Sequence, residues 1–426
     1  MTAAEYQQAT NFLLPLEHSA PPLKIALLGY RSAPFVGGQG IYLKYLSKAL
    51  VQIGHHVTIY SGQPYPEVPQ GVTLVKVPSL DLFAAENHAT ALRWHHLRSL
   101  TDLSEWWTML TGGFGEPYTF SRRIAKLLAH SDYDIIHDNQ SLGFGLIELQ
   151  QRGKCVVSTI HHPIHRDRET AVAAAPNWQH RLLAKRWYSF LTMQEKVVRQ
   201  LKHITTVSKT SAIDINRYFN CRDNVHLIPN GIDTTLFKPL MISKKAYRLI
   251  TTASSDQPVK GLTVLLRAFA IVVKQYPDAH LRIIGTLKKG GDAEQLITAL
   301  QLSNHLSFRS NLSTEALARE YNKASVAVCP SLYEGFGLPA GEAMACGLPV
   351  VSSNGGALPE VVGEAGIIVE AGNSQALAEG IEQLFSNPDL AHSFSRVARQ
   401  RVLEKFCWNR VAEQMTLYYH SILANP

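Results

Sequence analysis

Two kinds of hydrophobic pattern alternate along this chain. Short runs rich in Val, Ile and Leu predict buried strands, and the longer segments between them, with apolar residues every three or four positions, predict helices. Strands that alternate with helices are typical of parallel sheets, because each parallel connection needs a crossover. In the first half the helix is expected at 42–53 and the strands at 24–29, 56–60, 72–77, 134–137, 156–160 and 204–207.

A second alternation starts at Tyr247, with a helix at 261–276 and strands at 249–252, 281–284, 306–308, 326–329, 349–352 and 366–369. The simplest architecture is an α/β protein with two doubly wound, Rossmann-like domains and a cleft between them. The expected segments are a flexible tail at 1–22, one domain at 23–238, a second at 239–407 and a closing helix at 408–426.

Composition narrows the class of protein only slightly. A length of 426 residues favours two or three domains. No apolar run approaches the roughly 20 residues that span a bilayer, and residues 1–22 lack the pattern of a signal peptide. The five scattered cysteines include no C-x-x-C pair, which predicts neither a disulfide framework nor a zinc site and fits a reducing cytosol.

The charge balance favours anionic partners. The formal net charge is +7, from 41 Lys and Arg against 34 Asp and Glu. This excess suits a ligand such as a nucleotide diphosphate, and it also suits the surface of an anionic membrane. Nucleic acid is disfavoured, because the chain has no basic run, zinc finger or RNP motif.

Residues 331–363 (SLYEGFGLPAGEAMACGLPVVSSNGGALPEVVG) carry the strongest functional signal. Glu334 and Glu342 are separated by seven residues, among glycines and prolines that predict a loop running into a helix. Pro339 suits the first turn of that helix, and Glu342 is expected in the same turn beside unpaired backbone N–H groups. Two carboxylates beside free N–H donors suit a ligand with phosphate and sugar hydroxyls.

Other polar motifs also follow predicted strands. The run Gly37-Gly38-Gln39-Gly40 follows the first strand, His161 follows the strand at 156–160, and Glu334 follows the strand at 326–329. In doubly wound folds, ligands bind outside the carboxyl ends of the strands. We therefore expect these positions to lie on the ligand-binding face of their sheets.

Together these segments resemble the family-4 retaining glycosyltransferases, which have the GT-B fold. Glu334 and Glu342 match the E-x7-E motif of that family, residues 228–239 (IPNGIDTTLFKP) match the end of its first domain, and residues 259–261 (Val-Lys-Gly) match the start of a phosphate-contacting helix. Residues 159–161 (Thr-Ile-His) match the active-site histidine. The resemblance covers nearly the whole chain, and it implies retaining sugar transfer and a last helix that crosses back onto the first domain.

Each matched position has an expected task. A cation at Lys260 stabilises the diphosphate that leaves as the anomeric bond breaks. Glu342 accepts hydrogen bonds from the ribose, Glu334 lies near the donor sugar, and His161 donates to a sugar hydroxyl or handles a proton near neutral pH. The predicted catalytic residues are His161, Lys260 and Glu334; the predicted donor-binding residues are Gly37, Gly38, Ser255, Lys260, Arg309, Glu334, Phe336, Gly337, Leu338 and Glu342. For Phe336, packing within the loop is an equally good explanation.

The chain departs from the family at one charged position. Most members carry an arginine five or six residues before the lysine, where this chain has Thr-Thr-Ala-Ser-Ser-Asp at 251–256. Ser254 or Ser255 can donate a hydrogen bond to phosphate but brings no charge. We expect another cation to replace the arginine, and the candidates are Lys288, Lys289 and Arg309.

Metal and dinucleotide sites are disfavoured. The glycine run at 37–40 is not G-x-G-x-x-G, and three histidines at 161, 162 and 165 without a fourth ligand are weak evidence for zinc. Asp132-Tyr133-Asp134 matches the D-x-D metal motif of another glycosyltransferase fold but is expected to form a turn. No metal and no cofactor are therefore expected.

The acceptor side is expected around residues 82–120, which are long and irregular for this fold, and 178–188. Aromatic and basic residues in both segments suit a sugar face or a membrane surface, and buried packing explains them equally well. The expected enzyme moves a sugar from a UDP- or GDP-sugar to a hydroxyl acceptor, a glycan or a lipid-linked molecule, in the cytoplasm or at the inner face of the membrane. The alternative is a catalytically weak nucleotide-sugar-binding module of the same fold.

Overall fold

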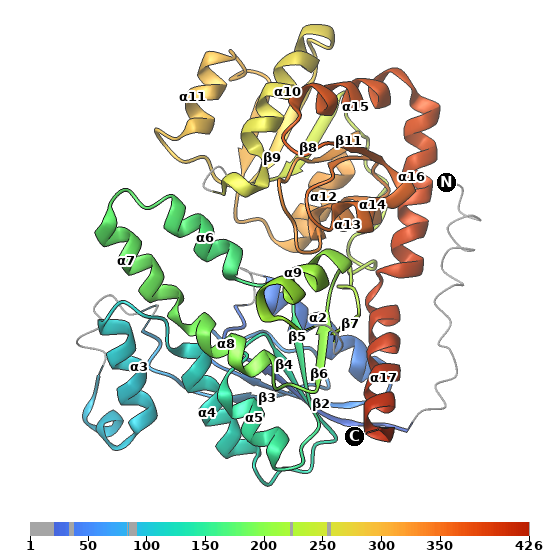
Figure 1. Ribbon diagram of the computed structural model, residues 1–426. Coiled ribbons are helices and arrows are strands. Elements are labelled where there is room, and N and C mark those ends of the chain that lie inside the picture. The colour runs from blue at the N-terminus through green and yellow to red at the C-terminus, as the bar shows by residue number, and fades with distance from the viewer. Residues whose placement is uncertain are drawn as a thin grey trace. The chain divides into compact units, whose positions relative to one another are not determined.

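The computed structural model describes residues 21–33, 38–82, 84, 92–221, 225–253 and 257–425. These residues form two compact units. The first unit contains the described residues from 21 to Ile228 and from Val411 onward, and the second unit contains those of Pro229–Arg410. Each unit is built on its own parallel sheet with helices on the faces (Figure 1), which confirms the prediction of two doubly wound α/β domains.

The sheet of the first unit has seven strands in the order β3-β2-β1-β4-β5-β6-β7, and every pair is parallel. Six of the strands were predicted, and the short β7 was missed. The strands are β1 (Lys24–Gly29), β2 (His56–Ser61), β3 (Thr73–Lys76), β4 (Ile135–Asn139), β5 (Val156–Ile160), β6 (His203–Thr206) and β7 (Val225–Leu227).

The helices of the first unit differ from the expectation in two places. The first helix begins at Gly38, so the end of the predicted glycine loop is already helical. The segment at 82–120, expected to be irregular, contains η3, α3 and the start of α4; Ser99 caps α3 by accepting a hydrogen bond from the Asp102 N–H at 3.2 Å. The helices are α2 (Gly38–Gln52), η3 (Trp94–Arg98), α3 (Leu100–Leu110), α4 (Glu116–Leu128), α5 (Phe144–Gln151), α6 (His165–Ala173), α7 (Trp178–Trp187), η4 (Tyr188–Phe190), α8 (Leu191–Val198), α9 (Lys209–Phe219) and the last helix, α17 (Trp408–Ala424).

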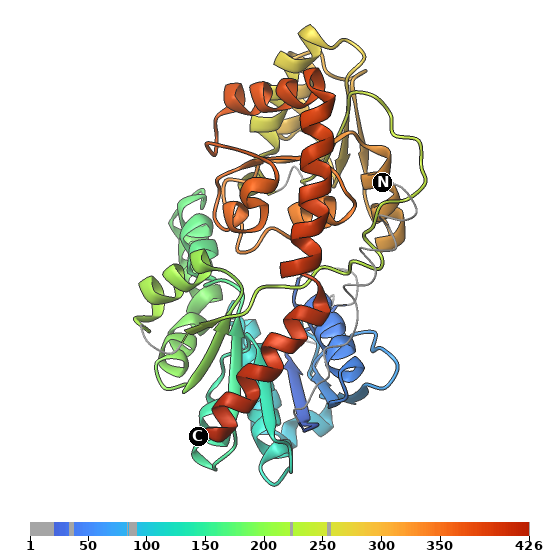
Figure 2. The same cartoon turned by 90° about the vertical axis from the view of Figure 1, so that its right-hand side faces the viewer.

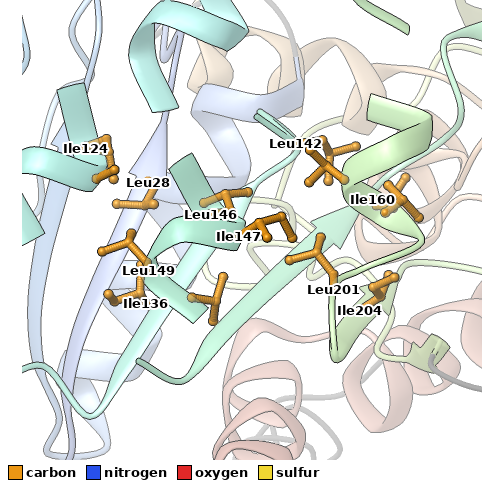
Figure 3. Packing of buried hydrophobic residues seen from close by; sticks show 14 of the residues in the cluster. Leu28, Ile124, Ile136, Leu142, Leu146, Ile147, Leu149, Ile160, Leu201 and Ile204 are labelled. Atoms are coloured by element: carbon orange, nitrogen blue, oxygen red, sulfur yellow. The ribbon is translucent and has the colours of Figure 1, made fainter. Parts of the chain in front are cut away.

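One hydrophobic core of the first unit lies between its sheet and helices that cover one face. Figure 3 shows Leu28 of β1 and Ile136 of β4 beside Leu146 and Leu149 of α5. All four side chains are fully buried. Burial of each such side chain contributes about 1.5–3 kcal/mol, so this face fixes the strands whose carboxyl ends carry the candidate residues.

The last helix, α17, begins in the second unit and belongs to the first unit from Val411 onward. Figure 2 shows it in red, running across the strands of the first unit's sheet. Three contacts join it to histidines of that unit. The His55 Nε2 and Thr416 Oγ1 atoms are 2.8 Å apart, the His137 Nδ1 and Tyr419 Oη atoms are 2.5 Å apart, and the Tyr418 ring stacks on His226 at 4.5 Å.

The sheet of the second unit has six parallel strands in the order β10-β9-β8-β11-β12-β13, and all six were predicted to within one residue at each end. They are β8 (Arg248–Thr252), β9 (His280–Ile284), β10 (Leu306–Arg309), β11 (Val326–Cys329), β12 (Val350–Ser353) and β13 (Ile367–Val369). The helices are η5 (Pro258–Lys260), α10 (Leu262–Gln275), α11 (Asp292–Ala299), α12 (Thr314–Lys323), α13 (Leu338–Ala345), α14 (Leu358–Val362), η6 (Gly363–Ala365), α15 (Ser374–Ser386) and α16 (Pro388–Lys405). None of the described helices has both the length and the hydrophobicity of a membrane-spanning segment.

Candidate active site

The strand order of the second unit reverses between β8 and β11, because β8 pairs with β9 on one side and with β11 on the other. Ligands of doubly wound folds bind outside the carboxyl ends of the strands at such a point. A small pocket, partly open to solvent, lies there. It is lined by Thr252, Val328, Cys329, Pro330, Ser331, Glu334, Pro339, Ala340 and Leu358.

Glu334 and Lys260 form an ion pair at this pocket. The Lys260 Nζ atom lies 2.8 Å from the Glu334 Oε1 atom, and the Ser331 hydroxyl donates to the same oxygen at 2.8 Å. Lys260 ends η5, and Gly261, with φ +68°, turns the chain into α10. The cation is therefore held next to a carboxylate, in a position from which an anionic ligand can draw it away.

Glu342 lies in the second turn of α13, not in the first turn as predicted. Gly337 takes φ +103° and caps the helix, so that Leu338 is the first helical residue. Burial raises the pKa of Glu342 to about 8, and a hydrogen bond from the Tyr321 hydroxyl at 3.3 Å offsets this only in part. Glu342 is therefore mostly protonated at neutral pH when no ligand is bound.

The loop before α13 offers backbone donors. Among the described residues, no hydrogen-bond partner is found for the N–H groups of Phe336, Gly337 and Leu338. The Phe336 side chain is buried and packs edge-on against Phe406, with ring centroids 5.7 Å apart. The Phe336 ring therefore has a packing role. The backbone N–H groups of the loop suit the predicted role of donating hydrogen bonds to phosphate or sugar hydroxyls.

The remaining donor-side predictions are placed differently. Arg309 ends β10, which β9 separates from β8, and it does not line the pocket. It lies near Arg282, whose pKa is lowered by burial and by the positive charges of Arg248 and Arg309. Gly37 and Ser255 lie outside the described residues.

The strand order of the first unit reverses between β1 and β4, and a second polar cluster lies at the carboxyl ends of β4 and β5. His161 follows β5, and its Nε2 atom lies 2.7 Å from the Asn139 Oδ1 atom. Asn139 ends β4 and donates to the Gln39 carbonyl in the first turn of α2 at 3.0 Å, next to Gly38. The Gln140 Oε1 atom accepts from the His161 backbone N–H at 2.7 Å. His161 and Gly38 are thus brought to one region, as predicted.

The hydrogen bonds of Asn139 assign the tautomer of His161. The Asn139 amide nitrogen donates to Gln39, so its oxygen faces the ring, and the Nε2 atom of His161 carries the hydrogen. The Nδ1 atom is then an acceptor. Burial, reinforced by the charges of His162 and His137, lowers the pKa of His161 to about 3. A neutral ring whose Nε2 hydrogen is held by Asn139 leaves Nδ1 as its unassigned hydrogen-bonding atom. The predicted roles of His161, donation to a sugar hydroxyl or proton transfer, stay predictions.

Three residues of this cluster were missed by the sequence analysis. Asn139 and Gln140 lie just after the strand predicted at 134–137, and this position is the signal from which they could have been found. Tyr42 of α2 presents its ring edge to His161, with ring centroids 4.7 Å apart. Tyr42 belongs to an apolar helical segment, and that pattern gave no sign of a contact with His161.

Residues that were considered as metal ligands from the sequence make other contacts in the structure. Asp132 pairs with the Lys24 side chain, and Asp134 accepts from the Lys24 backbone N–H at 2.7 Å. The His165 ring stacks on Tyr218 at 4.8 Å, and its Nε2 atom lies 3.0 Å from Glu195. Within the described part of the chain, no three His, Cys, Asp or Glu side chains gather as metal ligands would.

Solved structures with the same fold are glycosyltransferases. Sucrose-phosphate synthase from Thermosynechococcus elongatus superposes with a TM-score of 0.71 at 23% identity, over 95% of this chain and 100% of that one. HepE from Anabaena, solved in complex with UDP-glucose, superposes with a TM-score of 0.68 at 18% identity, over 94% of this chain and 100% of that one. The chain has the GT-B fold of these enzymes.

Sequence relatives define the family. Residues 36–236 match Glycosyltransferase Family 4, and residues 237–401 match Glycosyl transferases group 1. The "MMP alpha-(1->4)-mannosyltransferase" of Mycolicibacterium hassiacum is 42% identical over 409 residues, which cover 94% of this chain and 99% of that protein. A "D-inositol 3-phosphate glycosyltransferase" of an Arthrobacter species is 25% identical, over 93% of this chain and 95% of that protein. The protein belongs to glycosyltransferase family 4.

Proposed function

We propose that this glycosyltransferase moves a mannosyl group from a nucleotide diphosphate sugar to a hydroxyl acceptor, with retention of configuration and without a metal ion. The observation that carries the proposal is the Lys260–Glu334 ion pair in a pocket at the point where the strand order reverses. A diphosphate would take Lys260 from Glu334, and Glu334 would then accept hydrogen bonds from the sugar. The choice of mannose is supported by the name of the Mycolicibacterium relative.

The groups at the pocket bind different parts of the donor, according to their charge and hydrogen-bonding capacity. The N–H groups of Phe336, Gly337 and Leu338, at the start of α13, bind phosphate oxygens or sugar hydroxyls. Glu342 receives the ribose diol, whose two hydroxyl groups supply the hydrogen bonds that the buried carboxyl group lacks. Lys260 stabilises the negative charge that grows on the leaving diphosphate, which lowers the barrier more than it strengthens ground-state binding.

Retention follows from a front-face reaction. The acceptor oxygen bonds to the anomeric carbon on the side from which the diphosphate departs, the carbon–phosphate-oxygen bond breaks, and the hydroxyl proton passes to the leaving phosphate. Neutral His161 accepts a hydrogen bond from a sugar hydroxyl at its Nδ1 atom and so orients the sugar. The missing family arginine is replaced by a cation from Lys288 or Lys289, which follow β9 next to β8, and Ser255 adds a neutral donor.

The acceptor is a glycan or a lipid-linked molecule, and the protein works in the cytoplasm with peripheral contact to the membrane. This part of the proposal is supported by an apolar surface over η3, α3 and α7. Arg186 of α7 donates to Thr111 after α3 at 2.7 Å, so the two helices lie together. Their exposed apolar side chains are Trp94, Leu97, Leu100, Trp107, Leu110, Trp178, Leu182 and Leu183.

Release of nucleotide diphosphate tests the proposal. The protein is incubated with GDP-mannose, UDP-mannose or UDP-glucose, with and without oligomannoside acceptors and with EDTA present, and the anomeric configuration of the product is determined by NMR. One donor is expected to support transfer. Lys260→Ala is expected to lower the rate by roughly 10²–10³-fold, because the leaving charge loses its cation, and Glu334→Gln to lower it comparably.

Lys274→Ala is the matched control, because Lys274 is exposed in the last turn of α10 in the same unit. Binding of a nucleotide sugar with neither hydrolysis nor transfer would favour the binding module instead. Inverted product, or full activity of Lys260→Ala, would contradict the proposal.

A further inference from the structure

A continuous row of buried hydrogen bonds joins α17 to the surroundings of His161. The Tyr419 Oη atom lies 2.5 Å from the His137 Nδ1 atom, and the His137 Nε2 atom lies 2.6 Å from the Thr159 Oγ1 atom. The Thr159 Oγ1 atom lies 2.6 Å from the Thr205 Oγ1 atom and 3.3 Å from the Tyr42 Oη atom. All five side chains are at most 5% exposed. The Tyr42 ring in turn contacts the His161 ring.

Burial assigns the donors and acceptors of the first two hydrogen bonds in this row. Tyr419 is fully buried, so its hydroxyl must donate, and His137 Nδ1 is its acceptor among the described residues. His137 then donates from Nε2 to Thr159. Beyond Thr159 either oxygen can be the donor, both toward Thr205 and toward Tyr42, so the row continues as hydrogen bonds of open direction.

The row ends at the ring of His161, which Asn139 also holds. Asn139 fixes one ring nitrogen of His161, and the Tyr42 ring fixes the plane of the imidazole by an edge-on contact at an interplanar angle of 82°. Tyr42 sits on α2 and Thr159 on β5, so the row ties the helix and the strand on either side of His161 to each other. A shift of Tyr42 would tilt the acceptor lone pair at Nδ1.

We propose that Tyr419 is a positioning residue for His161, acting through His137, Thr159 and Tyr42. The last helix thereby holds the imidazole in the one orientation that suits its sugar partner. The inference rests on the proposed function, because it assigns Tyr419 to the turnover of the same enzyme. It adds a residue that lies on another element and touches neither substrate.

Tyr419→Phe tests this proposal, because it removes the hydroxyl and keeps the ring. Two variants of the same helix serve as controls. Tyr418→Phe makes the same chemical change one residue away, where the ring stacks on His226 and stays outside the row. Thr416→Val removes the hydrogen bond to His55 and so weakens the seating of α17 without touching the row.

Three measurements are made on each full-length variant. They are kcat and KM for the donor that the wild type uses, the Kd for the matching nucleotide diphosphate, and the ¹⁵N chemical shifts of the histidine rings. Tyr419→Phe is expected to lower kcat about 5- to 20-fold while KM for the donor and Kd change less than twofold, since one buried hydrogen bond is lost. The His161 ring signals, assigned with His161→Gln, are expected to shift or broaden only in Tyr419→Phe.

The outcomes separate the two proposals. A wild-type protein that transfers no sugar defeats the proposed function, and the ring signals still decide whether Tyr419 controls His161. Unchanged His161 signals in Tyr419→Phe, or equal losses of kcat in Thr416→Val and Tyr419→Phe, would overturn the positioning role and leave Tyr419 as an anchor of the helix only.

Discussion

Two carboxyl groups of the second unit have opposite surroundings although they lie near the same loop. Glu334 has Lys260 and Ser331 as partners, whereas Glu342 is buried and, among the described residues, its carboxyl group accepts a side-chain hydrogen bond only from Tyr321. Burial without a counter-charge favours the neutral acid, which is why the pKa of Glu342 rises to about 8. A bound diol would supply donors that favour the carboxylate, so nucleotide binding and proton release are linked.

This linkage predicts how pH acts on stability. Between about pH 4.5 and 8 the folded protein holds a proton on Glu342 that the unfolded chain has lost, so the free energy of unfolding falls as pH rises through this window. Glu342→Gln lacks this slope. Its melting temperature, relative to wild type, is expected to be several degrees higher at about pH 8 than at about pH 5, while its affinity for the nucleotide falls roughly tenfold.

Thermal unfolding between these pH values, with and without nucleotide, checks this expectation. Glu379→Gln on the exposed face of α15 is the control, and its difference from wild type should not change with pH. Parallel pH curves for Glu342→Gln and wild type would show that Glu342 ionises normally in the folded protein.

Among the elements, the loop that carries Glu334 is shaped by a glycine on another segment. Gly356 follows β12 and takes φ +63°, and a Cβ atom there would lie 2.2 Å from the Glu334 carbonyl oxygen. The Ala357 N–H donates to that same oxygen at 2.9 Å. The turn between β12 and α14 therefore packs directly against the backbone of the Glu334 loop and supports it.

Gly356→Ala is expected to destabilise the second unit by about 2–4 kcal/mol, since it combines a strained φ with a clash against backbone. Gly290→Ala separates the two terms: Gly290 also has a positive φ, +69°, but no atom within 4 Å of the added Cβ, so about 1 kcal/mol is expected. Chemical denaturation measures both. Equal losses for the two variants would mean that the Glu334 loop is free to move away.

The strands and the glutamate loop could be predicted because their signals are local. Runs of Val, Ile and Leu mark buried strands, and residues that follow strands lie at the carboxyl edge of their own parallel sheet, as His161 does in the first unit and Glu334 in the second. The turn that holds Glu342 and the ionisation of His161 could not be predicted, because they depend on a positive φ at Gly337 and on burial by distant residues. Tyr42 and Tyr419 were missed because a buried tyrosine looks like any core residue until its hydroxyl partner is known.

In the molecule as a whole, exposed apolar side chains occur in both units, and several of them lie on η3, α3 and α7 of the first unit. Trp94 is 88% exposed and Trp178 is 72% exposed. Around them Arg93, Arg98, Arg181 and Lys185 are exposed, while the acidic Asp102 of α3 is engaged by Arg123 at 2.6 Å. Apolar side chains ringed by cations are suited to an anionic bilayer.

Flotation with vesicles of anionic lipid is expected to carry the wild-type protein, and to carry a Trp94→Ser/Trp178→Ser variant several-fold less, because apolar area and interfacial rings drive insertion. Met241→Ser is the control, since Met241 is also fully exposed but lies in the second unit. Binding is expected to weaken with added salt. Equal flotation of all three proteins would place the membrane contact elsewhere.

The first unit is formed by two separate stretches of the chain, and this has a consequence during synthesis. Its sheet leaves the ribosome before residues 229–410, yet Tyr419, Thr416 and Tyr418 follow that whole stretch. Until they arrive, His137 and His55 lack their partners on α17, and the surface that α17 covers stays open to water. The half of the protein that is translated first is thus the last to be completed, and the nascent chain needs protection there until the last helix emerges.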